Sequence, residues 1–165
     1  MTIEIRDAEP HEFEMTGRIT ADAYREFVGT LNADWQSYLD HIADVSGRAD
    51  RTKILIALEN ESILGSATLE LDGRVDLDED GPLGPNEAHI RMLGVAPEAR
   101  GRGIAKMLMT ECETRALASG RTVMTLYTTH LMKSAQAMYE SLGYERGEDR
   151  PFPDGFVLLS YSKSL

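Results

Sequence analysis

The segment from Val95 to Ala105 constrains the fold of this chain more than any other part of the sequence. Its residues are VAPEARGRGIA, and they join residues 88–95, which alternate in polarity, to the long segment 103–119. The alternation is typical of a strand, and the second segment favours a helix that ends at Gly120 as a C-cap. The sequence therefore predicts a strand, a glycine-rich turn and a long helix in direct succession.

The glycine-rich turn is a candidate anion site. Glycines at positions 101 and 103 let the backbone curl so that N–H groups converge where the helix begins. Helix N-termini bind anions, and Arg100 and Arg102 would add charge-assisted contacts to phosphate oxygens. An isolated turn of this kind is more often only a tight turn. The dinucleotide and P-loop motifs do not fit, because position 106 is Lys and no Gly-Lys-Ser/Thr follows.

The rest of the chain alternates between strand and helix patterns around one sheet. We expect a flexible connection at 72–86, which contains three glycines and two prolines. The element order suits a mixed α/β or α+β fold, and 165 residues suit one domain spanning 1–165. Strands are predicted at 2–6, 53–58, 63–71, 88–95, 123–128 and 156–161, and helices at 10–28, 103–119 and 131–142, with another beginning near Asp34 as N-cap and reaching Val45.

Composition excludes several classes of protein. The 17 basic and 28 acidic residues give a net charge of −11, which disfavours nucleic-acid binding and would attract a cationic acceptor such as an amine. Solubility explains most of that charge. The single cysteine, Cys112, forms no internal disulfide and is expected to pack in the long helix. No segment is apolar enough to span a membrane, and the N-terminus lacks signal-peptide character, so the cytoplasm is the expected compartment.

The strand before the turn changes its apolar phase near its end. In a regular strand over residues 88–95, one face would carry Ala88, Ile90 and Met92, and the other would carry His89 and Arg91. The apolar residues then change phase, because Leu93 and Val95, on either side of Gly94, continue the apolar face. A slip of one residue is what a β-bulge produces. The alternative is that this strand end simply packs into the core.

Two motifs together resemble the GNAT superfamily of acetyl-coenzyme A-dependent N-acetyltransferases. The first is Arg100-x-x-Gly-x-Ala105, preceded by Val95-x-Pro97. The second is the segment 135–144, a helix with Ala and Tyr that ends in Gly-Tyr. They occur in the order and separation that the family shows, and the resemblance is specific between about residues 88 and 145.

This resemblance implies a fold and a donor site. The expected fold is a single α/β (α+β) domain with a mixed, mostly antiparallel sheet of six to seven strands, about four helices and a splay at a bulge near 93–95. Acetyl-coenzyme A would donate the acetyl group, with its pantetheine arm in the splay and no metal. The residues implied for cofactor binding are Leu93, Gly94, Val95, Arg100, Gly101, Arg102, Gly103, Ile104, Ala105 and Ala135.

The resemblance also implies direct attack by a primary amine, of a small molecule or a protein, in a ternary complex. Tyr139 would protonate the departing thiolate, although its helical stripe equally suits a core aromatic. His89 is the best candidate base, with a half-exposed polar strand residue as the alternative and Glu87 and the acidic loop as weaker candidates. The family often has Glu at position 89, and Asn where this chain has Met132. The resemblance also makes a homodimer a possible form of the protein.

Other interpretations stay open at this stage. The chain could be a non-catalytic module of the same fold that binds coenzyme A or another phosphate ligand. A nucleotide-binding regulator would rest on the glycine turn alone. His11, His41 and His130 show no metal-ligand spacing. The aromatic residues of the N-terminal helices, some of which would line the acceptor side, are Tyr24, Phe27, Trp35 and Tyr38.

Overall fold

The computed structural model describes residues 2–27, 35–153 and 155–165, and these residues build one mixed sheet of eight strands. The strand order is β1-β2-β3-β4-β5-β8-β6, with β7 also paired to β8. Only β4 and β5 pair in parallel, and all other neighbours are antiparallel. The strands are β1 (Glu4–Asp7), β2 (Lys53–Glu59), β3 (Ser62–Glu70), β4 (Glu87–Val95), β5 (Val123–Thr129), β6 (Glu145–Arg146), β7 (Arg150–Pro151) and β8 (Val157–Ser164).

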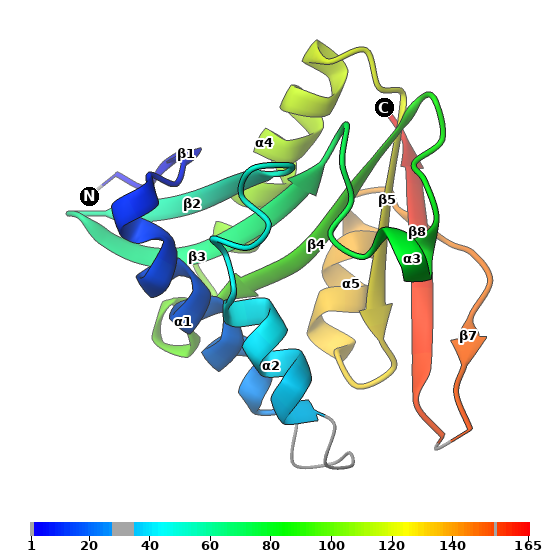
Figure 1. Ribbon diagram of the computed structural model, residues 1–165, viewed down its shortest axis with the longest axis horizontal. Coiled ribbons are helices and arrows are strands. Elements are labelled where there is room, and N and C mark those ends of the chain that lie inside the picture. The colour runs from blue at the N-terminus through cyan, green and yellow to red at the C-terminus, as the bar shows by residue number, and fades with distance from the viewer. Residues whose placement is uncertain (1, 28–34, 154) are drawn as a thin grey trace.

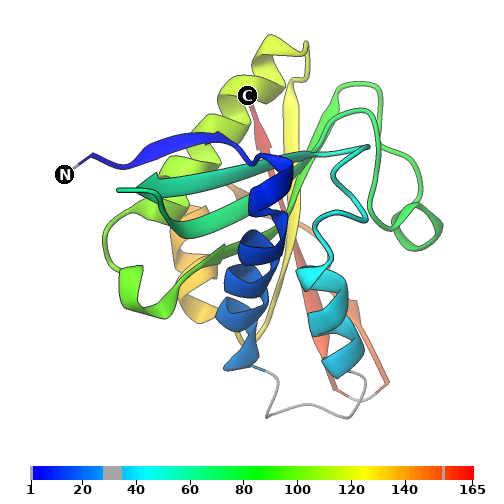
Figure 2. The same cartoon turned by 60° about the vertical axis from the view of Figure 1, so that its left-hand side comes forward.

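Helices cover both faces of the sheet. Figure 1 shows α1 and α2 on one face and α4 and α5 on the other, and Figure 2 shows the same arrangement from a second direction. The main core lies between the sheet and α4, while a smaller apolar cluster joins α1 and α2 to β4. The helices are α1 (Phe13–Arg25), α2 (Trp35–Ala43), α3 (Leu77–Asp80), α4 (Ile104–Ala118) and α5 (Lys133–Ser141), with 3-10 turns at Pro10–Glu12 and Pro97–Ala99.

The predicted fold class is confirmed, with more elements than expected. The additional strands β6 and β7 have two residues each, and α3 has four, so none is long enough to leave a periodic pattern. The expected end of the first helix at Val28 and the expected N-cap Asp34 lie outside the described residues. No helix in the described ranges is long and apolar enough to cross a membrane.

A β-bulge interrupts β4, as predicted, and its centre is Met92. Thr68 of β3 pairs with Arg91, but Ser66 pairs with Gly94, so β4 contains one extra residue over this stretch. Met92 has a φ of +53°, and its side chain joins the α1–α2 cluster instead of sharing the face of Ala88 and Ile90. The prediction for Met92 was therefore wrong. The extra residue turns its side chain to the opposite face of the sheet.

Beyond the bulge, β4 and β5 separate. Their parallel pairing ends at Ile90 and Leu126, after which β5 continues against β8 (Figure 1). The Ala96 N–H donates to Leu64 O over 2.8 Å, so alternate N–H groups of β4 point toward β3. The N–H groups of Leu93 and Val95 consequently point to the other side, into the gap between β4 and β5.

Candidate active site

The N-terminus of α4 presents a row of free backbone donors. Gly101 and Gly103 have φ values of +80° and +79°, and a Cβ added to either would meet nothing within 4 Å. Gly103 is the N-cap, and no side chain from the described part of the chain caps the helix. The first bond into the helix is Met107 N–H to Gly103 O, and within the described residues the N–H groups of 101–106 donate to no acceptor. This open row of N–H groups suits an anion.

The two arginines of the turn form ion pairs within the protein. Arg102, with 41% of its side chain exposed, places a terminal nitrogen 2.5 Å from Glu59 Oε2. Arg100 lies 2.5 Å from a carboxylate oxygen of Glu26 and donates to Ala23 O over 3.3 Å. Such exposed pairs contribute little to stability. Both guanidinium groups are therefore already paired with carboxylates, whereas the backbone N–H groups of the turn are not.

Tyr139 lies on α5 and is part of the main core. It is 6% exposed, and its ring contacts those of Tyr144 and Tyr161 at centroid distances of 6.1 and 5.8 Å. Burial raises the pKa of its phenol above the ordinary value, with a smaller contribution from Tyr161. Its hydroxyl forms no hydrogen bond with any other described residue. Ala135, one turn earlier on α5, packs against the same core.

Tyr24 lies on α1, which covers the opposite face of the sheet from α5 (Figure 1). Burial raises the pKa of Tyr24, and the nearby phenols of Tyr38 and Tyr139 raise it further. The sequence analysis listed Tyr24 only among the aromatic residues that could line the acceptor side, and assigned the proton donor to Tyr139.

His89 is buried on the α1–α2 face of β4, with 1% of its surface exposed. Its Nδ1 lies 2.7 Å from Thr125 Oγ1 on β5. Its Nε2 is buried and, within the described ranges, has no hydrogen-bond partner. Burial lowers the pKa of the imidazole well below its usual value, and Arg91 and Arg74 lower it further. His89 is therefore uncharged at neutral pH, and it is more buried than the half-exposed alternative in the sequence analysis.

Arg91 connects the same face of β4 to the segment that precedes it. Its guanidinium lies 3.2 Å from Glu70, 2.6 Å from Asp76 and also against Asp80. Glu70 is fully buried, and burial raises the pKa of its carboxyl while Arg91 opposes that rise. Asp80 is shared with Arg74 at 3.6 Å. The segment 72–86, expected to be a flexible connection, contains α3 and forms ion pairs with the sheet through Asp76 and Asp80.

Comparison with known proteins assigns the chain to a family. Residues 17–144 match the model of the acetyltransferase (GNAT) family. The chain belongs to this family. The PaiA N-acetyltransferase of Thermoplasma acidophilum, solved with coenzyme A, is similar in structure, with a TM-score of 0.77, 18% identity and 100% of both chains covered.

Two further solved structures resemble this acetyltransferase. YncA of Salmonella typhimurium, a putative acetyltransferase solved with acetyl-CoA, has a TM-score of 0.73 and 19% identity over 100% of this chain and 95% of its own. The ribosomal-protein-S18-alanine N-acetyltransferase of Escherichia coli has a TM-score of 0.71 and 16% identity over 99% of this chain and 94% of its own. At these identities the likeness shows the shared fold.

Aromatic side chains border the α1–α2 face of this acetyltransferase. The Trp35 ring lies 5.2 Å from Tyr38 and 5.5 Å from Phe156, between ring centroids. Tyr127 lies 5.1 Å from the His89 ring, and the guanidinium carbon of Arg150 lies 5.3 Å from the Tyr127 centroid. The sequence analysis missed three of these residues: Tyr127 on β5, Arg150 on β7 and Phe156 directly before β8. Their separation in sequence from α2 left no local signal.

Other candidate features do not join this region. Two surface hollows of about 300 Å³ lie elsewhere, one along the outer sides of α1 and α2 and one around residues 49–53 and 69–73. Burial raises the pKa of the Cys112 thiol to about 12, which leaves it a poor nucleophile.

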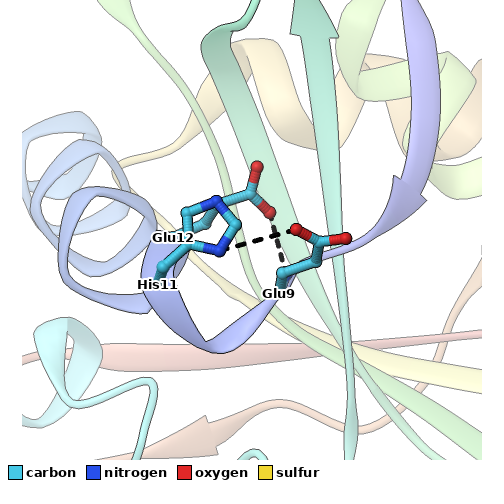
Figure 3. Close-up of side chains that lie close together, drawn as sticks. All are labelled: Glu9, His11 and Glu12. Atoms are coloured by element: carbon cyan, nitrogen blue, oxygen red, sulfur yellow. Dashed lines mark hydrogen bonds and ion pairs between the residues drawn. The ribbon is translucent and has the colours of Figure 1, made fainter.

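One group of side chains has atoms close enough together to suggest a metal site. Figure 3 shows Glu9, His11 and Glu12 at the start of the N-terminal 3-10 turn. Glu12 already accepts hydrogen bonds from Arg6, at 2.7 and 2.9 Å, and from the Glu9 N–H at 2.8 Å. The Arg6 hydrogen bond lowers the pKa of Glu12 to about 2. This exposed group is therefore explained as a capping box held by an arginine.

Proposed function

We propose that this GNAT acetyltransferase is an N-acetyltransferase that transfers the acetyl group of acetyl-coenzyme A to a primary amine by direct attack in a ternary complex. The observation that carries the proposal is the row of N–H groups at 101–106 that have no acceptor among the described residues, in the turn that follows β4 after its pairing with β5 has ended. Acetyl-coenzyme A supplies a thioester and a pyrophosphate, and the two relatives solved with it or with coenzyme A share this fold.

The donor side binds mainly through backbone groups. The N–H groups of Gly101 to Ala105 would hold the pyrophosphate, since the glycines leave no side chain in the way. The N–H groups of Leu93 and Val95 face the gap and would pair with the pantetheine arm. A donor in the gap would also stabilise negative charge that develops on the thioester oxygen. Ala135 is small enough to leave room beside the gap.

His89 and Tyr139 would handle the protons. An alkyl ammonium has no lone pair with which to attack, so a base must remove its proton, directly or through water. His89 is uncharged at neutral pH and can accept that proton. Tyr139 stays protonated because burial raises its pKa, so it can donate a proton to the departing thiolate. His89 lies on β4, where it still pairs with β5, and Tyr139 lies on α5.

A non-catalytic module that binds coenzyme A is the second candidate. It is favoured by the complete burial of His89 Nε2, which no acceptor reaches without movement of the covering side chains. Isothermal titration with acetyl-coenzyme A, together with thiol release measured over a panel of primary amines, separates the two. Thiol release that depends on one class of amine supports the enzyme. Tight binding with no release above the uncatalysed rate for any amine would overturn it.

A further inference from the structure

His89 is held by a chain of two hydrogen bonds across β4 and β5. Its Nδ1 lies 2.7 Å from Thr125 Oγ1, and this hydroxyl lies 2.5 Å from Glu87 Oε2. His89 and Thr125 are paired residues of the parallel ladder, and Glu87 lies two residues before His89 on the same face. The other Glu87 oxygen accepts the N–H of Gly84 over 3.0 Å, which fixes the carboxylate in place.

The donors and acceptors in this chain determine where the imidazole hydrogen lies. A threonine hydroxyl has a single hydrogen, and a carboxylate oxygen only accepts, so Thr125 donates to Glu87. Ala88 O, at 3.4 Å, is a much longer alternative for that hydrogen. The Thr125 oxygen must then accept from His89 Nδ1–H. Neutral His89 therefore carries its hydrogen on Nδ1 and a free lone pair on Nε2, the atom that has no described partner.

We propose that Thr125 and Glu87 are positioning residues that hold His89 in this tautomer, so that Nε2 takes the proton of the acceptor amine. The inference rests on the proposed function, in which His89 is the base. In the step, an N–H bond of the amine breaks and an N–H bond forms at Nε2, while Nδ1–H and the Thr125 O–H stay intact. The Glu87 carboxylate, acting through the polarised hydroxyl, offsets the positive charge that arises on the ring.

The charges around His89 explain why such an offset is needed. Arg91 and Arg74 both disfavour the imidazolium. Glu70, the residue opposite His89 on β3, is already bonded to Arg91. On the β5 side the ring faces Tyr127, over which Arg150 stacks. Among the described residues around His89, Glu87 is thus the carboxylate that a hydrogen-bond chain, through the Thr125 hydroxyl, connects to the imidazole.

The tautomer can be measured directly in the unmodified, ligand-free protein. Long-range proton–nitrogen NMR correlation spectra at pH 7.5, in which the His89 signals are assigned by their loss in the His89→Gln variant, should show Nδ1 protonated and Nε2 unprotonated. A protonated Nε2, or an imidazolium at this pH, would overturn the proposal without any activity measurement.

Substitutions of Thr125 test whether the hydrogen-bond chain acts in turnover. Thr125→Val should lose the tautomer preference, lower kcat about tenfold and move the acidic limb of the rate profile to lower pH, with an unchanged KM for acetyl-coenzyme A. Thr125→Ser keeps the hydroxyl and should retain all three properties. Thr52→Val is the matched control, because it also removes a hydroxyl bonded at 2.7 Å, to Arg48 O. It should leave the His89 spectrum and the pH profile unchanged.

The outcomes separate this proposal from the proposed function. If His89→Gln turns over slowly but Thr125→Val keeps the native rate and pH profile, the base stands and the positioning role is overturned. If His89→Gln itself acetylates at the native rate, the base fails and the positioning role fails with it. A slow Thr125→Val variant that Thr125→Ser rescues supports both.

Discussion

The proposed donor side and the proposed acceptor side consist of different chemical groups. At the N-terminus of α4 the groups proposed to bind the donor are backbone N–H groups, exposed by two glycines in the left-handed region. On the α1–α2 face of β4 they are buried side chains, Arg91 and its carboxylates and His89 with Thr125. The donor side should therefore tolerate the loss of its charged side chains, and the acceptor side should not.

The largest effect should come from Arg91→Leu, which breaks the acceptor side. It leaves the carboxylates of Glu70, Asp76 and Asp80 without their shared cation, and removing one partner of a buried ion pair typically costs about 3–5 kcal/mol. Urea unfolding measures the loss. Arg102→Leu, which removes an exposed ion pair on the donor side, is the control and should cost no more than about 1 kcal/mol. Equal losses in the two variants would contradict the comparison.

Gly103→Val should weaken the binding of acetyl-coenzyme A at the proposed donor side. The valine would have a φ of +79° and a side chain where the phosphate must approach, so the affinity for acetyl-coenzyme A should fall on the order of 100-fold. Gly120→Val at the other end of α4 is the matched control, because it has the same φ and the same open space. Titration calorimetry on both folded variants checks this. Native affinity in Gly103→Val would remove the turn from the cofactor site.

Tyr139→Phe tests the residue that lies between the two sides. It keeps the buried ring and removes only a hydroxyl that has no hydrogen bond within the described ranges, so stability and cofactor affinity should hardly change. The rate of the chemical step should fall about 100-fold. Tyr144→Phe is the control with the opposite expectation. The Tyr144 hydroxyl donates to Glu113 over 2.8 Å, so this variant should be less stable but should keep the native rate. A native kcat in Tyr139→Phe would make Tyr139 a core aromatic.

His89→Gln should change the free energy of unfolding less than Arg91→Leu does, and the change should appear only when stability is measured as a function of pH. The pKa of His89 is lowered by folding, so below about pH 6.5 the unfolded chain binds a proton that the folded protein does not. Native stability should thus fall as the pH decreases from 6.5 toward the folded pKa. Between pH 7.5 and 5.5 the wild type should lose about 1.4 kcal/mol more than the variant, as judged by urea unfolding. Identical pH dependence would mean that His89 is not buried uncharged.

The smallest effect should be that of Arg102→Ala on cofactor affinity. Its guanidinium is already paired with Glu59, so an added phosphate contact must compete with that carboxylate. We expect a change of less than about threefold in the affinity for acetyl-coenzyme A, or under 1 kcal/mol. A loss as large as that of Gly103→Val would show that side-chain charge, and not the backbone, dominates the donor side.

Much of the donor side could be predicted because it depends on local rules. The left-handed glycines, the helix they begin and the bulge in β4 each leave a pattern within a dozen residues, and all three are present in the structure. The side chain of Met92 was assigned to the wrong face because the exact position of an extra residue depends on pairing with β3. Pairing of that kind is not encoded in one strand alone.

The sequence by itself determined the strand–turn–helix unit, the family and the residue types near the gap. Only the tertiary structure decided the surroundings of His89, because they come from Thr125 on β5 and from Arg74 beside α3. It also decided that Arg100 and Arg102 pair with Glu26 and Glu59. The physical reason is range: backbone conformation follows from neighbouring residues, whereas burial and ion pairing depend on groups that only the fold brings together.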